Sequence, residues 1–324
     1  MDNRRNRNHG CVVTGVAGFV GSHLAERLLS RGISVVGVDN FFSGRRSNMD
    51  SFRSHPLFSF HERSITDPSL LGELKELHPE VDRCFHLAAV VSVPYSMDHA
   101  EETMRVNFGA TLALLEEAES LGFKSFVFAG SAAEYGNDPR LPLFEGYATP
   151  ETRWLSPYGE SKFRASRRIG ENPIGVALRF FNIYGPRQDP NSPYSGVISR
   201  FMDMALRGAP LTIFGDGGQT RDFVYVADVV NAYLAAADLK NADGAPPPTP
   251  NGHIYNIGTG RVTSILELAS MVRELSGNRE PLAHLPEREG DIRHSRASVE
   301  AFREATGWNP EFSLGTGLAA TLEW

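Results

Sequence analysis

The sequence contains little of what marks secreted, membrane-spanning or metal-binding proteins. Only two of its 324 residues are cysteine, and Cys11 and Cys84 both lie in apolar, strand-like runs. Buried free thiols are a simpler interpretation of this pair than a disulfide or a metal site. No apolar stretch approaches the length of a membrane span, and no apolar signal core precedes Cys11. We therefore expect a cytoplasmic protein with no membrane partner and no bound metal.

An excess of positive charge is also missing. The chain has 32 Lys and Arg against 39 Asp and Glu, a net charge of −7, and the two signs are intermixed. The one basic cluster lies at residues 3–7, and we interpret 1–9 as a disordered, solvated tail rather than a nucleic-acid site. The composition therefore predicts no nucleic-acid partner, and the length allows one large domain or two smaller ones.

The glycine-rich stretch Val12–Gly21 is the strongest local signal. An apolar run enters it, and a helix-like pattern leaves it. Gly15 permits a tight turn, Gly18 lets the backbone approach a pyrophosphate, and Gly21 lets the helix pack close to the strand. The N–H groups at the start of that helix would then face the phosphates. The pattern is typical of a dinucleotide-binding turn.

A second feature supports this interpretation. The next apolar run, Ser34–Val38, ends in Asp39, near the spacing at which a carboxylate reaches an adenosine ribose. Because this carboxylate would repel a 2′-phosphate, we expect the cofactor to be NAD rather than NADP.

Strand and helix patterns alternate through the first half of the chain, which indicates an α/β fold with a doubly wound parallel sheet, a Rossmann domain spanning 10–182. Ligands of such folds bind beyond the carboxyl ends of the strands. The further expected strands are Phe58–Glu62, Arg83–Leu87, Ser125–Ala129 and Ile174–Phe180, and the expected helices are Val20–Leu29, Ser69–Leu77, Glu101–Leu121 and Pro157–Ile169.

The texture changes after Asn182, where glycine and proline become common and the elements become shorter. We interpret 183–324 as mainly a smaller, substrate-binding lobe over the cofactor. The segment 221–257 is expected to return partly to the first domain, because it begins like a strand followed by a helix. Residues 240–252, with three consecutive prolines, are expected to form a loop.

Three residues form the candidate catalytic group. Tyr158 and Lys162 are four apart on a predicted helix, so their side chains share one face. The ammonium is expected to lower the pKa of the phenol from about 10 and make it a general base, helped by a positive nicotinamide ring. Ser131 follows a predicted strand and can share the proton. An ordinary amphipathic helix would also show the Tyr–Lys spacing, but the upstream glycine turn favours catalysis.

These motifs resemble the extended short-chain dehydrogenase/reductases, in particular the nucleoside-diphosphate-sugar epimerases, and the resemblance spans Cys11–Trp324. So many motifs in one order are specific for the superfamily and less so for the substrate. They are Thr14–Gly21, Val38–Asn40, His86–Ala89, Asn107, Ser131–Gly136, Tyr158–Lys162, Arg179–Asn182 and Arg221–Phe223.

The resemblance implies a set of NAD-binding residues. Where relatives often have Gly-Asp-hydrophobic at the adenine, this chain has Arg63-Ser64-Ile65, which keeps one hydrogen-bonding group and loses the carboxylate. We interpret His86 as a core histidine, and Asn107 as hydrogen-bonded to structure beneath the site. The implied cofactor-binding residues are Gly15, Gly18, Phe19, Val20, Gly21, Asp39, Asn40, Ser43, Gly44, Ser64, Ile65, Leu87, Ala88, Ala89, Asn107, Tyr158, Lys162 and Phe180.

The resemblance also implies a substrate site for a UDP-sugar. Ser131 and Asn182 would contact the substrate, and Arg221 and Arg288 would clamp its diphosphate, since a planar guanidinium meets phosphate oxygens in pairs. Ser295 would face the sugar 2-substituent, or lie at the surface if the register slips by one. Three apolar residues would flank the uracil, with core packing as an equal alternative: Val197, Phe201 and Phe214.

The function implied is an NAD-dependent 4-epimerase of UDP-glucose and UDP-galactose that passes through a 4-keto sugar. Because Ser295 is small, the pocket should also admit the N-acetylhexosamines. Dehydratases and decarboxylases of the superfamily need a glutamate or an Asp-Glu pair where this chain has Ala132 and Ala133, and the offset of Glu134 should point it away.

Several alternatives stay open. The enzyme could be a UDP-glucuronate 4-epimerase or another nucleoside-diphosphate-sugar epimerase. A member of another class, a non-catalytic NAD-sensing subunit, is less consistent with the intact catalytic group. The resemblance further implies a homodimer formed through the helices Glu101–Leu121 and Pro157–Ile169.

Overall fold

The computed structural model describes residues 9–190, 196–238, 253–288 and 290–324; the expected tail, except His9, and the proline-rich loop lie outside these residues. Its centre is a sheet of seven strands in the order β11-β6-β5-β4-β1-β2-β3, and every neighbouring pair is parallel. The strands are β1 (Gly10–Thr14), β2 (Ser34–Asp39), β3 (Phe58–Glu62), β4 (Val81–His86), β5 (Ser125–Ser131), β6 (Gly175–Phe180) and β11 (Ile254–Ile257). The expected doubly wound parallel sheet is confirmed.

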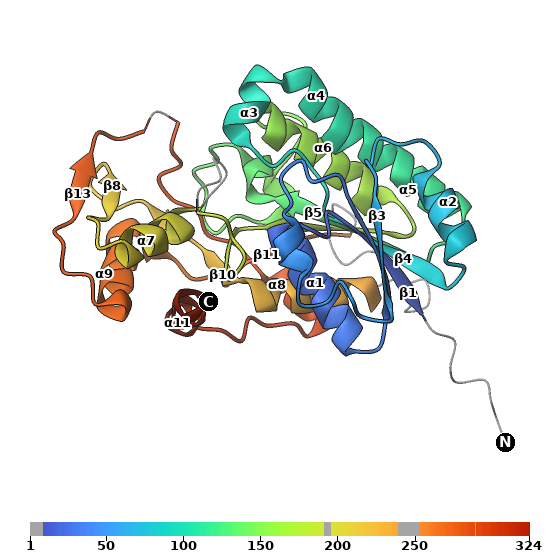
Figure 1. Cartoon of the computed structure of the whole chain (residues 1–324). Coiled ribbons are helices and arrows are strands. Elements are labelled where there is room, and N and C mark those ends of the chain that lie inside the picture. Colours follow the sequence, from blue (N-terminus) through green and yellow to red (C-terminus); the bar gives the residue numbers. More distant parts are fainter. Residues whose placement is uncertain (1–8, 191–195, 239–252, 289) are drawn as a thin grey trace.

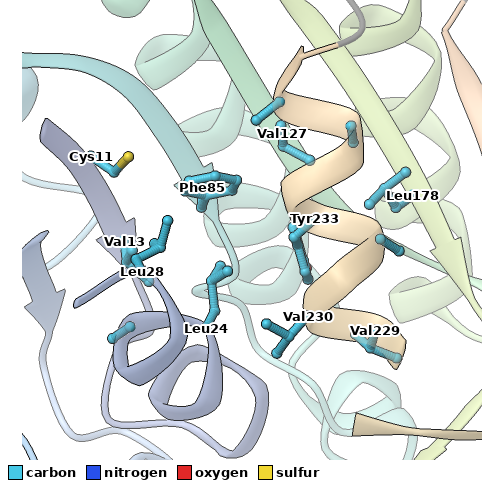
Figure 2. Packing of buried hydrophobic residues seen from close by; sticks show 14 of the residues in the cluster. Cys11, Val13, Leu24, Leu28, Phe85, Val127, Leu178, Val229, Val230 and Tyr233 are labelled. Atoms are coloured by element: carbon cyan, nitrogen blue, oxygen red, sulfur yellow. The ribbon is translucent and has the colours of Figure 1, made fainter. Parts of the chain in front are cut away.

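Helices cover both faces of this sheet (Figure 1). On one face lie α1 (Phe19–Ser30), α8 (Val226–Asp238) and α10 (Glu300–Thr306). Figure 2 shows how Leu24 and Leu28 of α1 and Tyr233 of α8 pack against strand residues such as Phe85. The other face is covered by α2 (Leu70–Leu77), α5 (Thr111–Ser120) and α6 (Pro157–Glu171). The segment 221–257 thus contributes α8 and β11 to the domain that precedes it.

The long helix expected over Glu101–Leu121 is interrupted. It consists of α4 (Ala100–Met104), a π-helical turn (Arg105–Ala110) and α5, and it follows the short helix α3 (Val93–Asp98). The side chain of Asn107, inside the π-helical turn, accepts a hydrogen bond from Val90 N (2.7 Å) and donates one to Val90 O (2.9 Å). Asparagine is unfavourable inside a helix because its side chain competes for backbone hydrogen bonds, and here it bonds Val90 in the loop after β4.

The C-terminal lobe lies beside the sheet (Figure 1). Its core joins α7 (Val197–Leu206), α9 (Ile265–Ser276) and α11 (Leu314–Glu323) through apolar residues such as Leu211 and Leu268. Among the described residues, no helix is long and apolar enough to cross a membrane. The short strands pair as β7 (Asn182–Tyr184) with β10 (Phe223–Tyr225), β9 (Thr220–Arg221) with β12 (Thr263–Ser264), and β8 (Thr212–Phe214) with β13 (Ala283–Leu285).

A buried ion pair ties the sheet to the loop after β5. Glu134, in the 3-10 turn Ala132–Tyr135, pairs with Arg179 of β6, and both side chains are at most 1% exposed. Glu134 also accepts hydrogen bonds from Ser131 N (2.9 Å) and Ser166 Oγ (2.8 Å). Arg179 donates to the carbonyl oxygen of Glu145 (2.8 Å), in the 3-10 turn Glu145–Tyr147. Burying both charges is tolerable only because each has these partners.

We therefore expect Arg179→Met to lower the free energy of unfolding by about 3–5 kcal/mol, because it leaves the Glu134 carboxylate buried without its counter-charge. Urea unfolding followed by circular dichroism measures this. Glu134→Gln combined with Arg179→Met should cost less than the two single changes together, and Arg164→Met, on an exposed helical pair with Glu160, should cost about 0.5 kcal/mol or less. An Arg179→Met protein as stable as the wild type would contradict the assignment.

Candidate active site

A cavity of about 570 Å³ opens along the carboxyl ends of the parallel strands. It lies at the point where the strand order reverses, between β1 and β4, where ligands of doubly wound folds bind. Of the residues expected to bind the cofactor, Asn107 does not line it; it is fully buried beneath. The others do: Gly15, Gly18, Phe19, Val20, Gly21, Asp39, Asn40, Ser43, Gly44, Ser64, Ile65, Leu87, Ala88, Ala89, Tyr158, Lys162 and Phe180.

The glycine turn has the shape that a phosphate cradle needs. Gly15 has a φ of +71°, and a Cβ there would lie 2.8 Å from Ala88 N. A Cβ at Gly21 would lie 2.1 Å from the carbonyl oxygen of Gly15, so only glycine lets α1 approach β1 this closely. Gly18 is the N-cap of α1 and has no side-chain cap, which leaves the first N–H groups of the helix available to an anion. This chain's residues fit a dinucleotide.

Asp39 lines the cavity at the end of β2 and is 7% exposed. Its carboxylate accepts hydrogen bonds from Phe41 N (2.7 Å) and Ala17 N (3.0 Å), so it also joins the β2 loop to the glycine turn. Burial raises the pKa of this carboxyl, and the backbone donors of Phe41 and Ala17 oppose that rise. The sequence predicts the position of this carboxylate but not its structural role in joining two loops.

His86 is a core residue, as the sequence suggests. Its Nδ1 lies 2.7 Å from Thr14 Oγ1, and its Nε2 lies 2.8 Å from Thr111 Oγ1. Thr14 Oγ1 also accepts the backbone N–H groups of Leu87 (3.1 Å) and Ala88 (3.2 Å), which fixes the lining of the cavity after β4. Burial lowers the pKa of His86 to about 3, so the ring is neutral.

Ser131, Tyr158 and Lys162 all line the cavity and come together at its inner end. The Ser131 hydroxyl accepts a hydrogen bond from Ala133 N (3.2 Å) and bonds the Tyr158 hydroxyl. Lys162, 2% exposed, donates from Nζ to Ala129 O (2.8 Å). Ser156 caps α6 by accepting from Gly159 N, with Pro157 in the first turn, which starts the helix that carries both Tyr158 and Lys162.

The prediction that Lys162 lowers the pKa of the Tyr158 phenol is wrong. The pKa of Tyr158 is raised, because burial penalises the phenolate more than the hydrogen bond from Ser131 favours it. Lys162 Nζ lies 5.9 Å from the centre of the Tyr158 ring and bonds a backbone carbonyl rather than the phenol. Burial also lowers the pKa of Lys162 to about 8. The i,i+4 spacing predicts the shared face but not the loss of solvation.

Of the residues expected to bind substrate, only Ser131 lines the cavity. The others lie outside its lining. Arg221, 14% exposed at its side chain, donates from Nη2 to Asp291 (2.5 Å), and Ser295 N donates to Thr220 O (3.2 Å). The guanidinium of Arg288 lies 3.6 Å from the ring centre of Phe214. Asn182 is exposed at the start of β7, Val197 is half-buried, and Phe201 is 2% exposed within the core of the lobe.

Several cavity-lining residues were not found by sequence reasoning. Arg45 follows Gly44, and Arg187 and Asp189 follow β7; all three line the cavity. Contacts between loops far apart in the chain leave no periodicity to detect.

The chain matches the family model described as the NAD dependent epimerase/dehydratase family over residues 11–258. A UDP-glucose 4-epimerase of Mycolicibacterium smegmatis is 36% identical over 97% of both chains. A UDP-N-acetyl-alpha-D-glucosaminuronate decarboxylase of Bacillus cytotoxicus is 34% identical, again over 97% of both chains.

Among solved structures, a UDP-glucose 4-epimerase of Thermotoga maritima with UDP-glucose has a TM-score of 0.85 and 34% identity, and the match covers 97% of both chains. The resemblance inferred from the motifs is thereby confirmed. Together with the glycine cradle and the Ser131, Tyr158 and Lys162 group, these matches show that the chain belongs to the NAD-dependent epimerase/dehydratase family.

Proposed function

We propose that the protein is a 4-epimerase of UDP-hexoses. The observation that carries this proposal is the Ser131, Tyr158 and Lys162 group at the inner end of a cavity that also holds the glycine cradle. Ala132 and Ala133 stand where the dehydratases and decarboxylases of the superfamily need acidic residues. The nearby Glu134 is turned into the sheet and paired with Arg179, so it is not available to a sugar. This leaves proton removal at a hydroxyl as the chemistry that the site supports.

In the proposed reaction, each residue of the catalytic group has a separate role. Bound NAD would supply the hydride acceptor and donor and a positive ring charge. Tyr158 takes the proton of the sugar 4-hydroxyl, and Ser131 shares it through their hydrogen bond. The 4-keto sugar would then turn over in the site while Arg221 and Arg288 hold its diphosphate, so that the hydride would return to the opposite face of C4. Tyr158 gives the proton back to the oxygen of the 4-keto group.

The alternatives differ in what they require of these residues. A UDP-glucuronate 4-epimerase needs a cation for the carboxylate and tends to have threonine where this chain has Asn182. A non-catalytic NAD-sensing subunit would not need the hydrogen bond between Ser131 and Tyr158. Mixing the protein with UDP-galactose and following UDP-glucose separates the sensing alternative from an enzyme.

The substrate range is proposed to include UDP-N-acetylglucosamine and UDP-N-acetylgalactosamine. Ser295 is small and lies beside Thr220, next in the chain to Arg221. A diphosphate held by Arg221 would therefore place the sugar within reach of this segment. Ser295 is 8% exposed, so a larger side chain there would take up the little room that an N-acetyl group would otherwise occupy.

We also propose a homodimer in the cytoplasm. The two buried free cysteines fit a reducing compartment. A groove between α5 and α6 combines apolar residues such as Leu112 and Phe163 with charged ones such as Glu116 and Arg164, and a second copy could cover this mixed surface.

We expect Tyr158→Phe to lower turnover about a hundred- to ten-thousandfold, because it removes the general base and keeps the ring that packs in the site. Conversion of UDP-galactose to UDP-glucose measures this, and the NAD content of the purified variant should match the wild type. A variant that retains more than a tenth of the wild-type rate would refute the role of Tyr158.

Ser295→Tyr should lower kcat/KM for the N-acetylhexosamine substrates by about tenfold or more, because an overpacked site costs roughly 1–3 kcal/mol. UDP-glucose should be affected about threefold or less, and Ser295→Ala should leave both substrate classes unchanged. If both classes fall together, or neither changes, Ser295 does not set the substrate range.

Light scattering should give twice the chain mass of 35.6 kDa. Leu112→Glu, in the groove between α5 and α6, should reduce this to a single chain because it buries a charge in the interface. Leu77→Glu, at a 66% exposed position of α2, is the matched control and should leave the mass unchanged. A monomeric wild type would contradict the proposal.

A further inference from the structure

The segment 185–190, which follows β7 and which we call the strap, is attached to the first domain at three points. His23 Nε2 of α1 donates to the carbonyl oxygen of Pro186 (2.9 Å). Arg187 Nη2 donates to Glu26 of α1 (2.7 Å) and to Ser51 Oγ (3.3 Å). Arg45, in the loop after β2, forms an ion pair with Asp189.

The two residues of the last contact, Arg45 and Asp189, come from different loops, and both line the cofactor cavity. Arg45, Gln188 and Asp189 line the same cavity as the glycine cradle. The backbone N–H of Arg45 donates to Ala17 O (2.9 Å), within that cradle. The Arg45–Asp189 pair therefore links the rim formed by the β2 loop to the rim formed by the strap.

The strap holds a conformation that depends on its attachments. Arg187 has a φ of +68°, a left-handed conformation that a residue other than glycine adopts only when its surroundings fix it. Its guanidinium supplies that fixation, since the Arg187 side chain is 13% exposed and paired with Glu26. The Arg45–Asp189 pair is the more accessible link, with side chains 53% and 20% exposed.

We propose that Arg45 and Asp189 act as a clasp that holds the two rims together over bound NAD and slows its release. The pair needs no contact with the cofactor; it acts by keeping the strap in place. Retention is useful because, if the protein is the proposed epimerase, the cofactor ends each cycle as it began and needs no exchange. An accessible ion pair is weakened by salt, so release of NAD should be faster at high ionic strength.

The test is the rate at which the holoenzyme, loaded with NAD if it purifies without it, exchanges the bound cofactor for isotopically labelled NAD. Arg45→Ala and Asp189→Asn should each exchange about two- to fivefold faster, within the range of a partly exposed ion pair. The double variant should be no faster than either single one. Arg45→Asp with Asp189→Arg should recover much of the slow exchange.

Arg46→Ala is the matched control, because Arg46 pairs with Glu62 at the surface and does not line the cavity. It should exchange NAD at the wild-type rate. Raising KCl should accelerate exchange in the wild type and not in Arg45→Ala. The proposal would be overturned if both single variants exchanged NAD at the wild-type rate, or if the effects of the two changes on that rate were additive in the double variant. No sugar is present in this assay, so its outcome is independent of whether the protein epimerises UDP-hexoses.

Discussion

The buried pair of Glu134 and Arg179 is the interaction on which the geometry of the site depends. Glu134 receives the backbone N–H of Ser131, and Arg179 holds the carbonyl oxygen of Glu145. Because neither charge has access to water, neither can move without losing a partner, so the end of β5 is fixed relative to β6. The same pair keeps the Glu134 carboxylate close to the site but engages it in the sheet.

Loss of solvation, rather than attraction between charges, governs the catalytic group. Burial raises the pKa of Tyr158 and lowers the pKa of Lys162 to about 8, so the phenol stays neutral near pH 7 while the lysine still carries most of its charge. The Ser131 hydrogen bond favours the phenolate but does not compensate for burial of the Tyr158 ring.

The sequence predicts what depends on local pattern. Gly15 and Asp39 follow strand ends at fixed spacing, and Tyr158 and Lys162 share a helix face, so their meeting at the carboxyl ends of the strands could be foreseen. The sequence does not predict what depends on burial or on contacts across the fold. Three features are of this kind, because each depends on residues that are distant in the sequence. They are the raised pKa of Tyr158, the π-helical turn at Asn107 and the pairing of Arg45 with Asp189.

Under the proposed function, discrimination among sugars falls to the C-terminal lobe, because Ser131 is the one residue expected to meet the substrate that lines the cofactor cavity. The lobe is held to the first domain through Asp222, whose buried carboxylate accepts the N–H groups of Thr259 (2.7 Å), Gly260 (2.9 Å) and Ala297 (3.1 Å). These hydrogen bonds fix the chain next to Arg221 and close to Ser295, outside the helix that carries Tyr158. Under the same proposal, the choice of sugar and the choice of reaction depend on different parts of the chain, since Ala133 lies after β5 in the first domain.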